Sequence, residues 1–317
     1  MEIVELVNAP ACRFCGAPLR VTFADLGVSP LANSYVDPRD AGKPEPFFQL
    51  HAWACESCFL VQLEAFETPE NIFGDYAYFS SVSTSWLEHC RDFVRGAIAR
   101  FGLNGESLIV ELASNDGYLL QYGKEAGIPV LGIEPARNVA AEAERRGIPT
   151  RVEFFGVESA RRLVADGLAA DLIVANNVLA HVPDINDFVA GVAIALKPLG
   201  RASFEFPHLL RLIEQRQFDT IYHEHYSYLS LSTVRRVFAA HGLEVVDVEE
   251  LPTHGGSLRV TAARAGAHDA SERVAELLAR EDARGLNRIE TYAGFKDGVD
   301  AAKRALLEFL ISAKRAG

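Results

Sequence analysis

The segment YHEHYSYLS (222–230) concentrates groups that can move protons, with two histidines, one glutamate and three tyrosines in nine positions. Imidazole titrates near neutrality, so His225 is the candidate general base of this segment. Tyr222 lies three residues upstream and could donate to a developing negative charge if the chain turns between them. In an extended segment Glu224 and His225 would face opposite ways, so we do not expect Glu224 to orient His225 directly. The alternative is that these side chains only pack at the polar edge of a sheet.

Two pairs of cysteines have the spacing of a metal site. Cys12 and Cys15 form one CxxC pair, and Cys55 and Cys58 form the other. Each pair can present two thiolates from one tight turn, and four thiolates make the tetrahedral set that zinc prefers. Such a site is closed to water, so we expect structural Zn²⁺ without a catalytic role. Redox dithiols or coincidence are the alternatives, and Cys90 is expected to be an ordinary buried side chain.

The composition limits the class of protein. The chain has 317 residues, 49% of them hydrophobic and 23% charged, which is ordinary for a soluble globular protein of about two domains. It contains no long apolar run and no basic, apolar signal sequence at its N-terminus, so we expect a cytoplasmic protein without a membrane span. The net charge of −12 opposes nucleic acid or an anionic membrane as the main partner, but not a small anionic ligand. For the oligomeric state the expectation leans slightly toward a monomer.

The hydrophobic pattern predicts three parts along the chain. Residues 1–66 contain short extended runs with Pro and Gly, and we expect a small β-rich zinc-binding domain there. Over residues 67–269 strands alternate with helices, which predicts an α/β fold with a doubly wound, Rossmann-like sheet. Its buried parallel strands are SLIVEL (107–112), VLGIEP (130–135), DLIVANNV (171–178) and ASFEFP (202–207), and LRVTAAR (258–264) could form an antiparallel edge hairpin with the strand before it. The stretch 185–200 is expected to be one helix, and residues 270–317 two amphipathic helices.

The loop after the strand 107–112 and the acid after the next strand predict a nucleoside-binding site. Glu134 follows Glu111 by 23 residues, where a carboxylate would accept hydrogen bonds from ribose hydroxyls. The dinucleotide fingerprint GxGxxG is absent, and Glu111 would repel a pyrophosphate but attract an amino group. These features favour S-adenosylmethionine (SAM), which has an ammonium and a sulfonium and no phosphate, over a dinucleotide bound by a degenerate loop. The candidate cofactor-binding residues are Glu111, Ala113, Ser114, Asn115, Gly117, Glu134, Phe154, Phe155 and Asn176.

Several motifs together resemble a known family. Besides the two CxxC pairs, these are YAYFSSVS (76–83), VELASNDGYLL (110–120), FEFPHL (204–209), YHEHYSYLS (222–230) and THGGSLRV (253–260). In this order they resemble the bacterial zinc-containing, SAM-dependent C-methyltransferases of nucleotide-linked 4-keto deoxysugars, such as the tetronitrose and mycarose 3-C-methyltransferases of antibiotic biosynthesis. The resemblance implies a class I methyltransferase fold, with Ala113 and Asn115 where the loop E/D-x-G-x-G-x-G has its first two glycines. Because that family normally continues for roughly another hundred residues, it also implies that 270–317 begin a C-terminal domain of which most is lacking.

The same resemblance implies a reaction and the residues that perform it. An enzyme of this kind removes the C3 proton of a dTDP-4-keto-6-deoxysugar and methylates the resulting enolate carbon. It places the base and its companions in YHEHYSYLS, so the candidate catalytic residues are His225, Tyr222 and Glu224. The candidate substrate contacts are Tyr76, His181 and His254, although His181 could equally belong to the cofactor shelf. The alternatives are a SAM-dependent O- or N-methyltransferase of another small metabolite, and a zinc- and SAM-binding module without catalysis.

Overall fold

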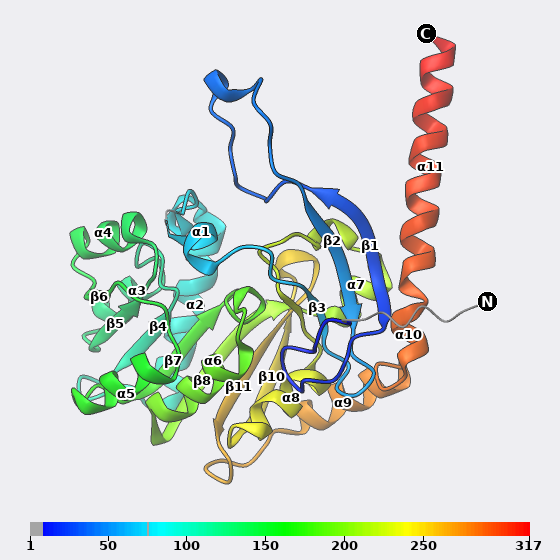
Figure 1. Cartoon of the computed structure of the whole chain (residues 1–317). Helices are drawn as coiled ribbons and strands as arrows, with labels where there is room; N and C mark the ends of the chain where they lie inside the picture. The colour runs from blue at the N-terminus through cyan, green and yellow to red at the C-terminus, as the bar shows by residue number, and fades with distance from the viewer. Residues whose placement is uncertain (1–8, 75) are drawn as a thin grey trace.

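A seven-stranded mixed sheet forms the centre of the computed structural model, which describes residues 9–74 and 76–317 (Figure 1). Its strand order is β10-β11-β8-β7-β4-β5-β6. The strands are β4 (Ile109–Leu112), β5 (Val130–Ile133), β6 (Thr150–Arg151), β7 (Ala170–Asn176), β8 (Leu196–Pro207), β10 (Leu243–Leu251) and β11 (Ser257–Arg264). Strands β4 to β8 pair in parallel, whereas β11 runs antiparallel between β8 and β10. This confirms the expected α/β class with a doubly wound sheet.

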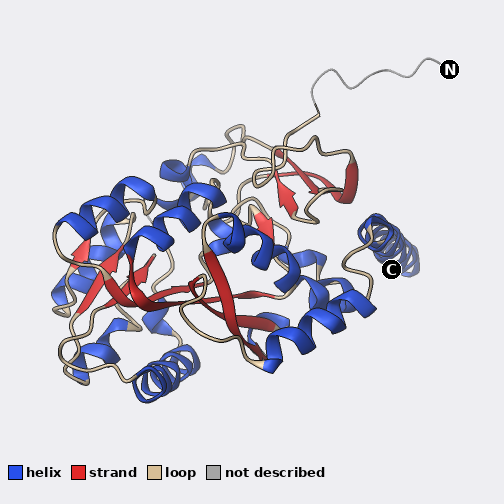
Figure 2. Cartoon of the chain, turned by 90° about the horizontal axis from the view of Figure 1, so that it is seen from below, coloured by secondary structure: helices blue, strands red, loops and turns tan. Residues whose placement is uncertain are grey.

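Helices cover both faces of this sheet (Figure 2). One face packs against α2 (Thr84–Phe101), α3 (Leu120–Glu125) and α4 (Arg137–Arg145). The other packs against α5 (Val157–Ala165), α6 (Ile185–Ala195), α8 (Leu231–Ala240) and α9 (Glu272–Ala283). Strands that are buried on both faces carry apolar residues at nearly every position, which is why β4 and β7 read as continuous hydrophobic runs. The carboxyl ends of β4, β5, β7 and β8 line the site described below.

A second, four-stranded sheet is assembled from two distant parts of the chain. Its order is β1 (Val21–Ser29), β2 (Phe48–Ala54), β3 (Val61–Leu63) and β9 (Ser227–Tyr228). The last strand comes from the YHEHYSYLS segment and pairs antiparallel with β3. The boundary predicted at residue 66 therefore does not separate two independent sheets. The cysteine turns lie at the end of this second sheet, next to α8 (Figure 1).

The C-terminal helices also pack on the second sheet. The sequence predicts two helices after residue 270, but the structure has three, because α9 is followed by α10 (Ile289–Ala293) and α11 (Phe295–Ala316). Gly285 has a φ of +84°, a left-handed conformation that ends α9. The ring of Phe295 stacks on Phe23 of β1 with 4.3 Å between the centroids. In the described part of the chain, no helix has both the length and the apolar composition of a membrane span.

A second expectation is also wrong in detail. The helix predicted over 185–200 ends at Ala195, and β8 begins at the next residue. Pro198 cannot donate a helical hydrogen bond and disfavours a helical conformation of the residue before it, so the helix stops ahead of it. The shorter helices are α1 (Pro69–Phe73) and α7 (Leu209–Gln215), with 3₁₀ turns at Pro38–Asp40, Ser80–Val82, Leu179–His181, Phe218–Thr220 and Thr253–Gly255.

One buried carboxylate joins α9 to the start of α8. Glu281 is 1% exposed, and its Oε1 accepts from the backbone N–H of Leu231 at 2.7 Å and lies 2.8 Å from Nε2 of His208. Its Oε2 accepts from the N–H of Ser232 at 2.8 Å. The first N–H groups of a helix have no partner within the helix, and the helix dipole favours negative charge there. Glu281 therefore satisfies the N-terminus of α8 from another helix.

We expect Glu281→Ala to lower the free energy of unfolding by about 3 kcal/mol, because three polar groups lose their buried partner. Urea denaturation measures this loss. The matched control is Glu276→Ala, which removes an exposed carboxylate of the same helix and should change stability by less than about 0.5 kcal/mol. Equal losses in the two variants would show that the buried carboxylate does not stabilise the junction.

Candidate functional site

A cavity of about 1050 Å³ opens at the carboxyl ends of the central strands. Its walls include Ala113 after β4, Glu134 after β5 and Asn176 at the end of β7, together with residues of α1, α2 and the segments 219–225 and 253–254. Doubly wound sheets bind ligands at this edge, where the strand order reverses. The volume lies at the upper end of the range of small-molecule sites, so the cavity has room for two ligands.

The loop after β4 has the backbone of a glycine-rich loop without the glycines. Ala113 and Asn115 adopt φ angles of +52° and +49°, in the left-handed region that favours glycine. The Asn115 side chain holds this conformation, because its Oδ1 accepts from the N–H of Ser80 at 2.9 Å and its Nδ2 donates to the carbonyl of Tyr78 at 3.0 Å. The aromatic linker after α1 and the loop after β4 are thus bound to each other.

Glu134 presents a fixed carboxylate to the cavity. Its Oε2 accepts from the N–H of Asn115 at 2.8 Å, and its Oε1 accepts from the N–H of Ala136 at 2.8 Å. Burial raises the pKa of Glu134, and the two backbone donors partly offset this rise. A carboxylate oxygen can accept more than one hydrogen bond, so each oxygen keeps a free acceptor position.

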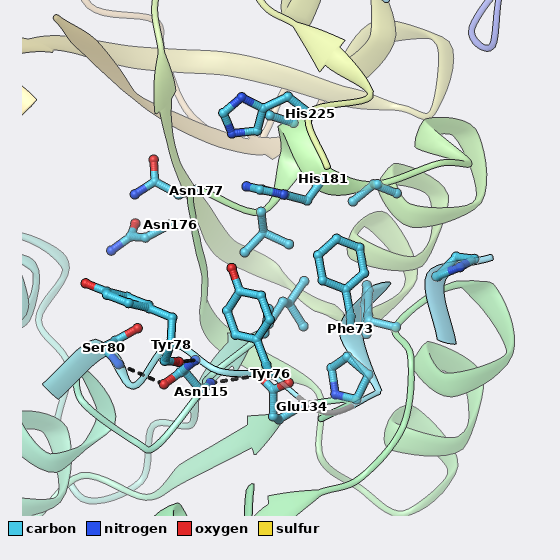
Figure 3. A pocket seen from close by; sticks show the side chains of 18 of the residues that line it. Phe73, Tyr76, Tyr78, Ser80, Asn115, Glu134, Asn176, Asn177, His181 and His225 are labelled. Atoms are coloured by element: carbon cyan, nitrogen blue, oxygen red, sulfur yellow. Dashed lines mark hydrogen bonds between the residues drawn. The ribbon is translucent and has the colours of Figure 1, made fainter. Parts of the chain in front are cut away.

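Asn176 faces the same cavity with unused hydrogen-bonding groups. Within residues 9–74 and 76–317, neither its Oδ1 nor its Nδ2 has a hydrogen-bond partner, although the side chain is buried. Buried polar atoms are normally satisfied, so an orphaned amide in a cavity indicates a ligand with both a donor and an acceptor. Figure 3 shows Asn176, Glu134 and Asn115 around one space.

Six of the nine candidate cofactor residues line this cavity, namely Ala113, Asn115, Glu134, Phe154, Phe155 and Asn176. The other three, Glu111, Ser114 and Gly117, are not among its lining residues. Glu111 is fully buried in β4, and burial raises its pKa well above the usual range. Gly117 is required by packing, because a Cβ there would come within 2.8 Å of Cγ1 of Ile148. Ser114 packs against Gly132, because a Cβ at position 132 would come within 2.3 Å of Oγ of Ser114.

The proton-handling segment turns instead of running straight. The N–H of His225 donates to the carbonyl of Tyr222 at 2.9 Å, which brings the Tyr222 hydroxyl to 2.9 Å from Nε2 of His225. Nδ1 of His225 lies 2.8 Å from the carbonyl oxygen of Thr220. A carbonyl only accepts, so Nδ1 carries the proton and Nε2 accepts from Tyr222. Burial lowers the pKa of His225 to about 4, so the imidazole is neutral at neutral pH.

Three of the remaining candidates line the cavity, and one does not. His181, Tyr76 and His254 line the cavity, and the rings of His181 and His225 lie 4.7 Å apart (Figure 3). Burial lowers the pKa of His181 well below its usual range. Glu224 is not among the lining residues, since its Oε1 accepts from Nδ2 of Asn33 at 2.8 Å. In the described residues the Glu224 side chain bonds to Asn33, and the His225 ring bonds to Tyr222 and Thr220.

The cavity wall includes residues that sequence reasoning missed, among them Asn177, Trp86 and His89. Asn177 follows Asn176 with a φ of +54°, so the two neighbouring amides both reach the cavity. Trp86 and His89 lie one turn apart on α2, and their rings stack with 4.9 Å between the centroids. Nε2 of His89 is 2.8 Å from Oε2 of the buried Glu205. The available signal was an aromatic residue and a histidine at i and i+3 in a helix, which is also the spacing of ordinary packing.

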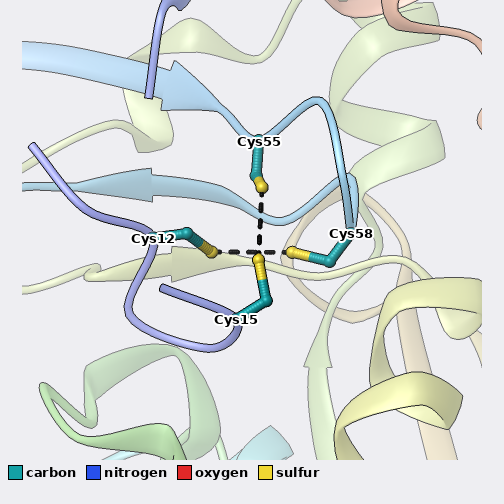
Figure 4. A group of neighbouring side chains, drawn as sticks. All are labelled: Cys12, Cys15, Cys55 and Cys58. Atoms are coloured by element: carbon teal, nitrogen blue, oxygen red, sulfur yellow. Dashed lines mark hydrogen bonds between the residues drawn. The ribbon is translucent and has the colours of Figure 1, made fainter. Parts of the chain in front are cut away.

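The four cysteines meet at one point, as their spacing predicts (Figure 4). All four Sγ atoms lie within 4.8 Å of one another, with 3.5 Å between Cys12 and Cys58 and 3.6 Å between Cys15 and Cys55. A tetrahedral zinc ion with Zn–S bonds of about 2.3 Å requires sulfurs about 3.8 Å apart. Nε2 of Gln62 also donates to Cys12 Sγ at 3.2 Å, which favours a thiolate. The donor set therefore fits Zn²⁺.

Comparison with known proteins adds three family matches and several relatives. The matched families are described as a zinc binding domain (residues 12–73), a methyltransferase domain (86–248) and a C-methyltransferase C-terminal domain (252–317). C-methyltransferase NovU of Streptomyces niveus is 36% identical over 300 residues, covering 94% of this chain and 71% of that protein. A ubiquinone biosynthesis O-methyltransferase of Methylobacterium sp. (strain 4-46) is 33% identical over 115 residues, which is 35% of this chain and 45% of that protein. The structure of magnesium protoporphyrin IX methyltransferase from Synechocystis PCC 6803 with bound SAM has a TM-score of 0.45 at 15% identity, covering 62% of this chain and 89% of that chain.

The buried His225 makes a pH-dependent contribution to stability. Its pKa falls from the usual 6.5 to about 4 on folding, so between these pH values the unfolded chain binds the proton more readily. The contribution is complete above pH 6.5 and is lost as the pH falls toward 4. We expect the loss between neutral pH and pH 5 to be about 2 kcal/mol. Urea denaturation at several pH values, with His225→Asn as the control that lacks this term, measures it. An identical pH dependence of the two proteins would contradict the neutral buried imidazole.

Proposed function

The chain belongs to the SAM-dependent C-methyltransferase family, and from this premise we propose that it methylates C3 of a dTDP-linked 4-keto-6-deoxysugar. The observation that carries the proposal is the neutral His225 imidazole, hydrogen-bonded to Tyr222 at the wall of a cavity with room for two ligands. A carbon acid must lose a proton before it can accept a methyl group, whereas an amine is already a nucleophile. A buried base at the cavity therefore supports carbon methylation of a ketone.

The proton of the substrate passes to His225 through Tyr222. The Tyr222 hydroxyl donates to Nε2 of His225, so its oxygen is free to accept the C3 proton while its own proton moves to Nε2. The C–H electron pair enters the ketone to give an enolate, Tyr222 stays neutral and His225 becomes imidazolium. Burial opposes this imidazolium, and the nearby enolate charge offsets that cost in a medium of low dielectric constant. The hydrogen-bond direction thus favours a relay for Tyr222 over its expected role as donor to the enolate oxygen.

Other cavity residues position the sugar and receive its developing charge. The enolate oxygen needs a donor, and the side chains of Asn177 and His254, which line the cavity, can supply an N–H. Tyr76 and His181 line the same space and would contact the sugar ring. Glu224 supports the turn from behind through its bond to Asn33. The same proposal includes three further points. The substrate carries a nucleotide, the enzyme serves deoxysugar and antibiotic biosynthesis, and it acts in the cytoplasm as a monomer.

The cofactor residues fit SAM in three places. Glu134 keeps a free acceptor position on each oxygen for the ribose hydroxyls, and Asn176 offers a donor and an acceptor to the methionine part. Phe154 and Phe155 supply apolar surface for the adenine. When bound, SAM supplies the electrophilic methyl group. These residues would hold it in the cavity that also takes the sugar.

The first test follows C3 of a dTDP-4-keto-6-deoxysugar by proton NMR in D₂O, first without SAM and then with it. We expect loss of the C3 proton signal and then a new C-methyl resonance. His225→Asn and Tyr222→Phe should each slow the C3 exchange at least about 100-fold, because each breaks the relay. SAM affinity, measured by calorimetry, should stay within about threefold in both variants, since neither residue belongs to the cofactor group.

The matched control for the relay is Tyr78→Phe, which removes a hydroxyl from another tyrosine of the cavity wall. It should leave the exchange rate nearly unchanged. Wild-type exchange rates in the His225 and Tyr222 variants would rule out this pair as the base. If the wild-type protein binds SAM but neither exchanges C3 nor methylates the sugar, the proposed substrate class is wrong.

The second test concerns the metal. Cys12, Cys15, Cys55 and Cys58 would hold Zn²⁺, which stabilises the fold and takes no part in the reaction. We expect one zinc per chain by mass spectrometry, and its loss in Cys58→Ser together with a drop in melting temperature of at least about 5 °C. The control is Cys90→Ser, which changes a buried cysteine outside the cluster and should keep the zinc. A Cys58→Ser protein with full zinc and an unchanged melting temperature contradicts the structural site.

A further inference from the structure

We infer that Arg13 is a positioning residue that holds the loop carrying His181 against the segment carrying His225. The inference rests on the proposed function for its effect on catalysis, although the positioning itself can be tested without any substrate. Arg13 lies inside the first cysteine turn (residues 12–15), between two ligands of the proposed zinc site. Arg13 is not itself a lining residue of the cavity, so any influence on the reaction must pass through other residues.

The guanidinium of Arg13 connects three separate segments. Its Nη1 donates to the carbonyl of Pro183 at 2.6 Å, and its Nη2 donates to the carbonyl of Leu63. The guanidinium carbon lies 5.2 Å from the centre of the Tyr226 ring. A planar guanidinium can bind carbonyls on two sides at once, which a lysine ammonium on a flexible chain does less well.

One of these contacts fixes the His181 side of the cavity. Pro183 lies two residues after His181 and itself lines the cavity. Nδ2 of Asn186, at the start of α6, donates to the carbonyls of Arg13 at 3.1 Å and Phe14 at 3.0 Å. The first cysteine turn is thus bonded to the loop 178–186 by the Arg13 side chain and by two backbone carbonyls.

The other contacts fix the His225 side. Tyr226 follows His225 directly, and its carbonyl accepts from the N–H of Leu63 at 3.1 Å. Leu63 therefore binds Arg13 through its carbonyl and the His225 segment through its N–H. The backbone N–H of Arg13 donates to Oε1 of Gln62 at 2.8 Å, and Gln62 pairs with Ser227 across β3 and β9. Arg13 therefore contacts both the segment that carries His181 and the strand that holds the His225 segment. The centroids of the His181 and His225 rings lie 4.7 Å apart.

The test compares Arg13→Met with Arg236→Met. Methionine keeps the aliphatic packing of arginine and removes all its donors. Arg236 is the matched control, because it bonds to the other cysteine turn, donating to the Ser57 carbonyl at 3.4 Å, and its guanidinium carbon lies 5.2 Å from the centre of the Phe59 ring. Neither contact reaches the cavity. The measurements are zinc content, SAM affinity, amide hydrogen exchange of the segments 178–186 and 222–228, and kcat and KM for C3 exchange of the sugar.

For Arg13→Met we expect zinc content unchanged, with SAM affinity and KM within about threefold, while kcat falls at least about tenfold. The amides of His181 and His225, which bond to Val178 and Tyr222 in the native turns, should exchange at least about tenfold faster. Arg236→Met should show neither change. If Arg13→Met fails to fold, Asn186→Ala removes the two backbone bonds but keeps the guanidinium, and it should show a smaller change of the same kind in segment 178–186.

Two outcomes would overturn the inference about Arg13, and a third would separate it from the proposed function. Arg13→Met behaving like Arg236→Met in amide exchange overturns the inference, and so does a loss of zinc, SAM affinity and kcat together, which indicates a general structural role. If the wild-type protein shows no C3 exchange, the proposed sugar chemistry has failed, and the amide exchange of the two variants still decides whether Arg13 positions the loop.

Discussion

The two-residue pairing of β3 with β9 is the contact on which the arrangement of the site depends. It joins the strand that follows the second cysteine turn to the segment that follows His225. A strand this short has little stability of its own, so the rest of the second sheet and the four-cysteine cluster must hold it. The cysteine cluster is therefore part of the support of the cavity, although it lies outside it.

Desolvation gives the cavity its chemical character. His181 and His225 are both held neutral by burial, and Glu134 is held in place by two backbone donors. In water these side chains would rotate freely. Here His225 is held by the Tyr222 hydroxyl and the Thr220 carbonyl, and Glu134 is held by its two backbone donors. Pre-organisation of this kind is what the proposed cofactor binding and carbon-acid chemistry require.

Local sequence patterns predicted the features that depend on neighbours in the chain. The cysteine spacing, the buried strands and the acid after β5 all follow from a few consecutive residues. What could not be predicted depends on distant segments meeting. Strand β9 exists only because β3 is there to pair with it, and the inward face of Trp86 and His89 is known only once α2 is placed. Two other differences are local. The turn that joins Tyr222 to His225 uses the Thr220 carbonyl, five residues from His225, and Gly285 ends α9 within a stretch whose pattern predicted one helix.

The left-handed conformations of Ala113 and Asn115 also determine which fragments of the chain could keep the native cofactor loop. Each costs about 1 kcal/mol or more for a residue with a side chain, and hydrogen bonds from the linker residues Ser80 and Tyr78 compensate at Asn115. A fragment that begins at α2 would contain every strand of the large sheet and still lack these bonds. Its loop would relax away from the native backbone, so the strands alone do not make a self-sufficient cofactor-binding module. A unit that keeps the native loop after β4 therefore has to include Tyr78 and Ser80, which precede α2.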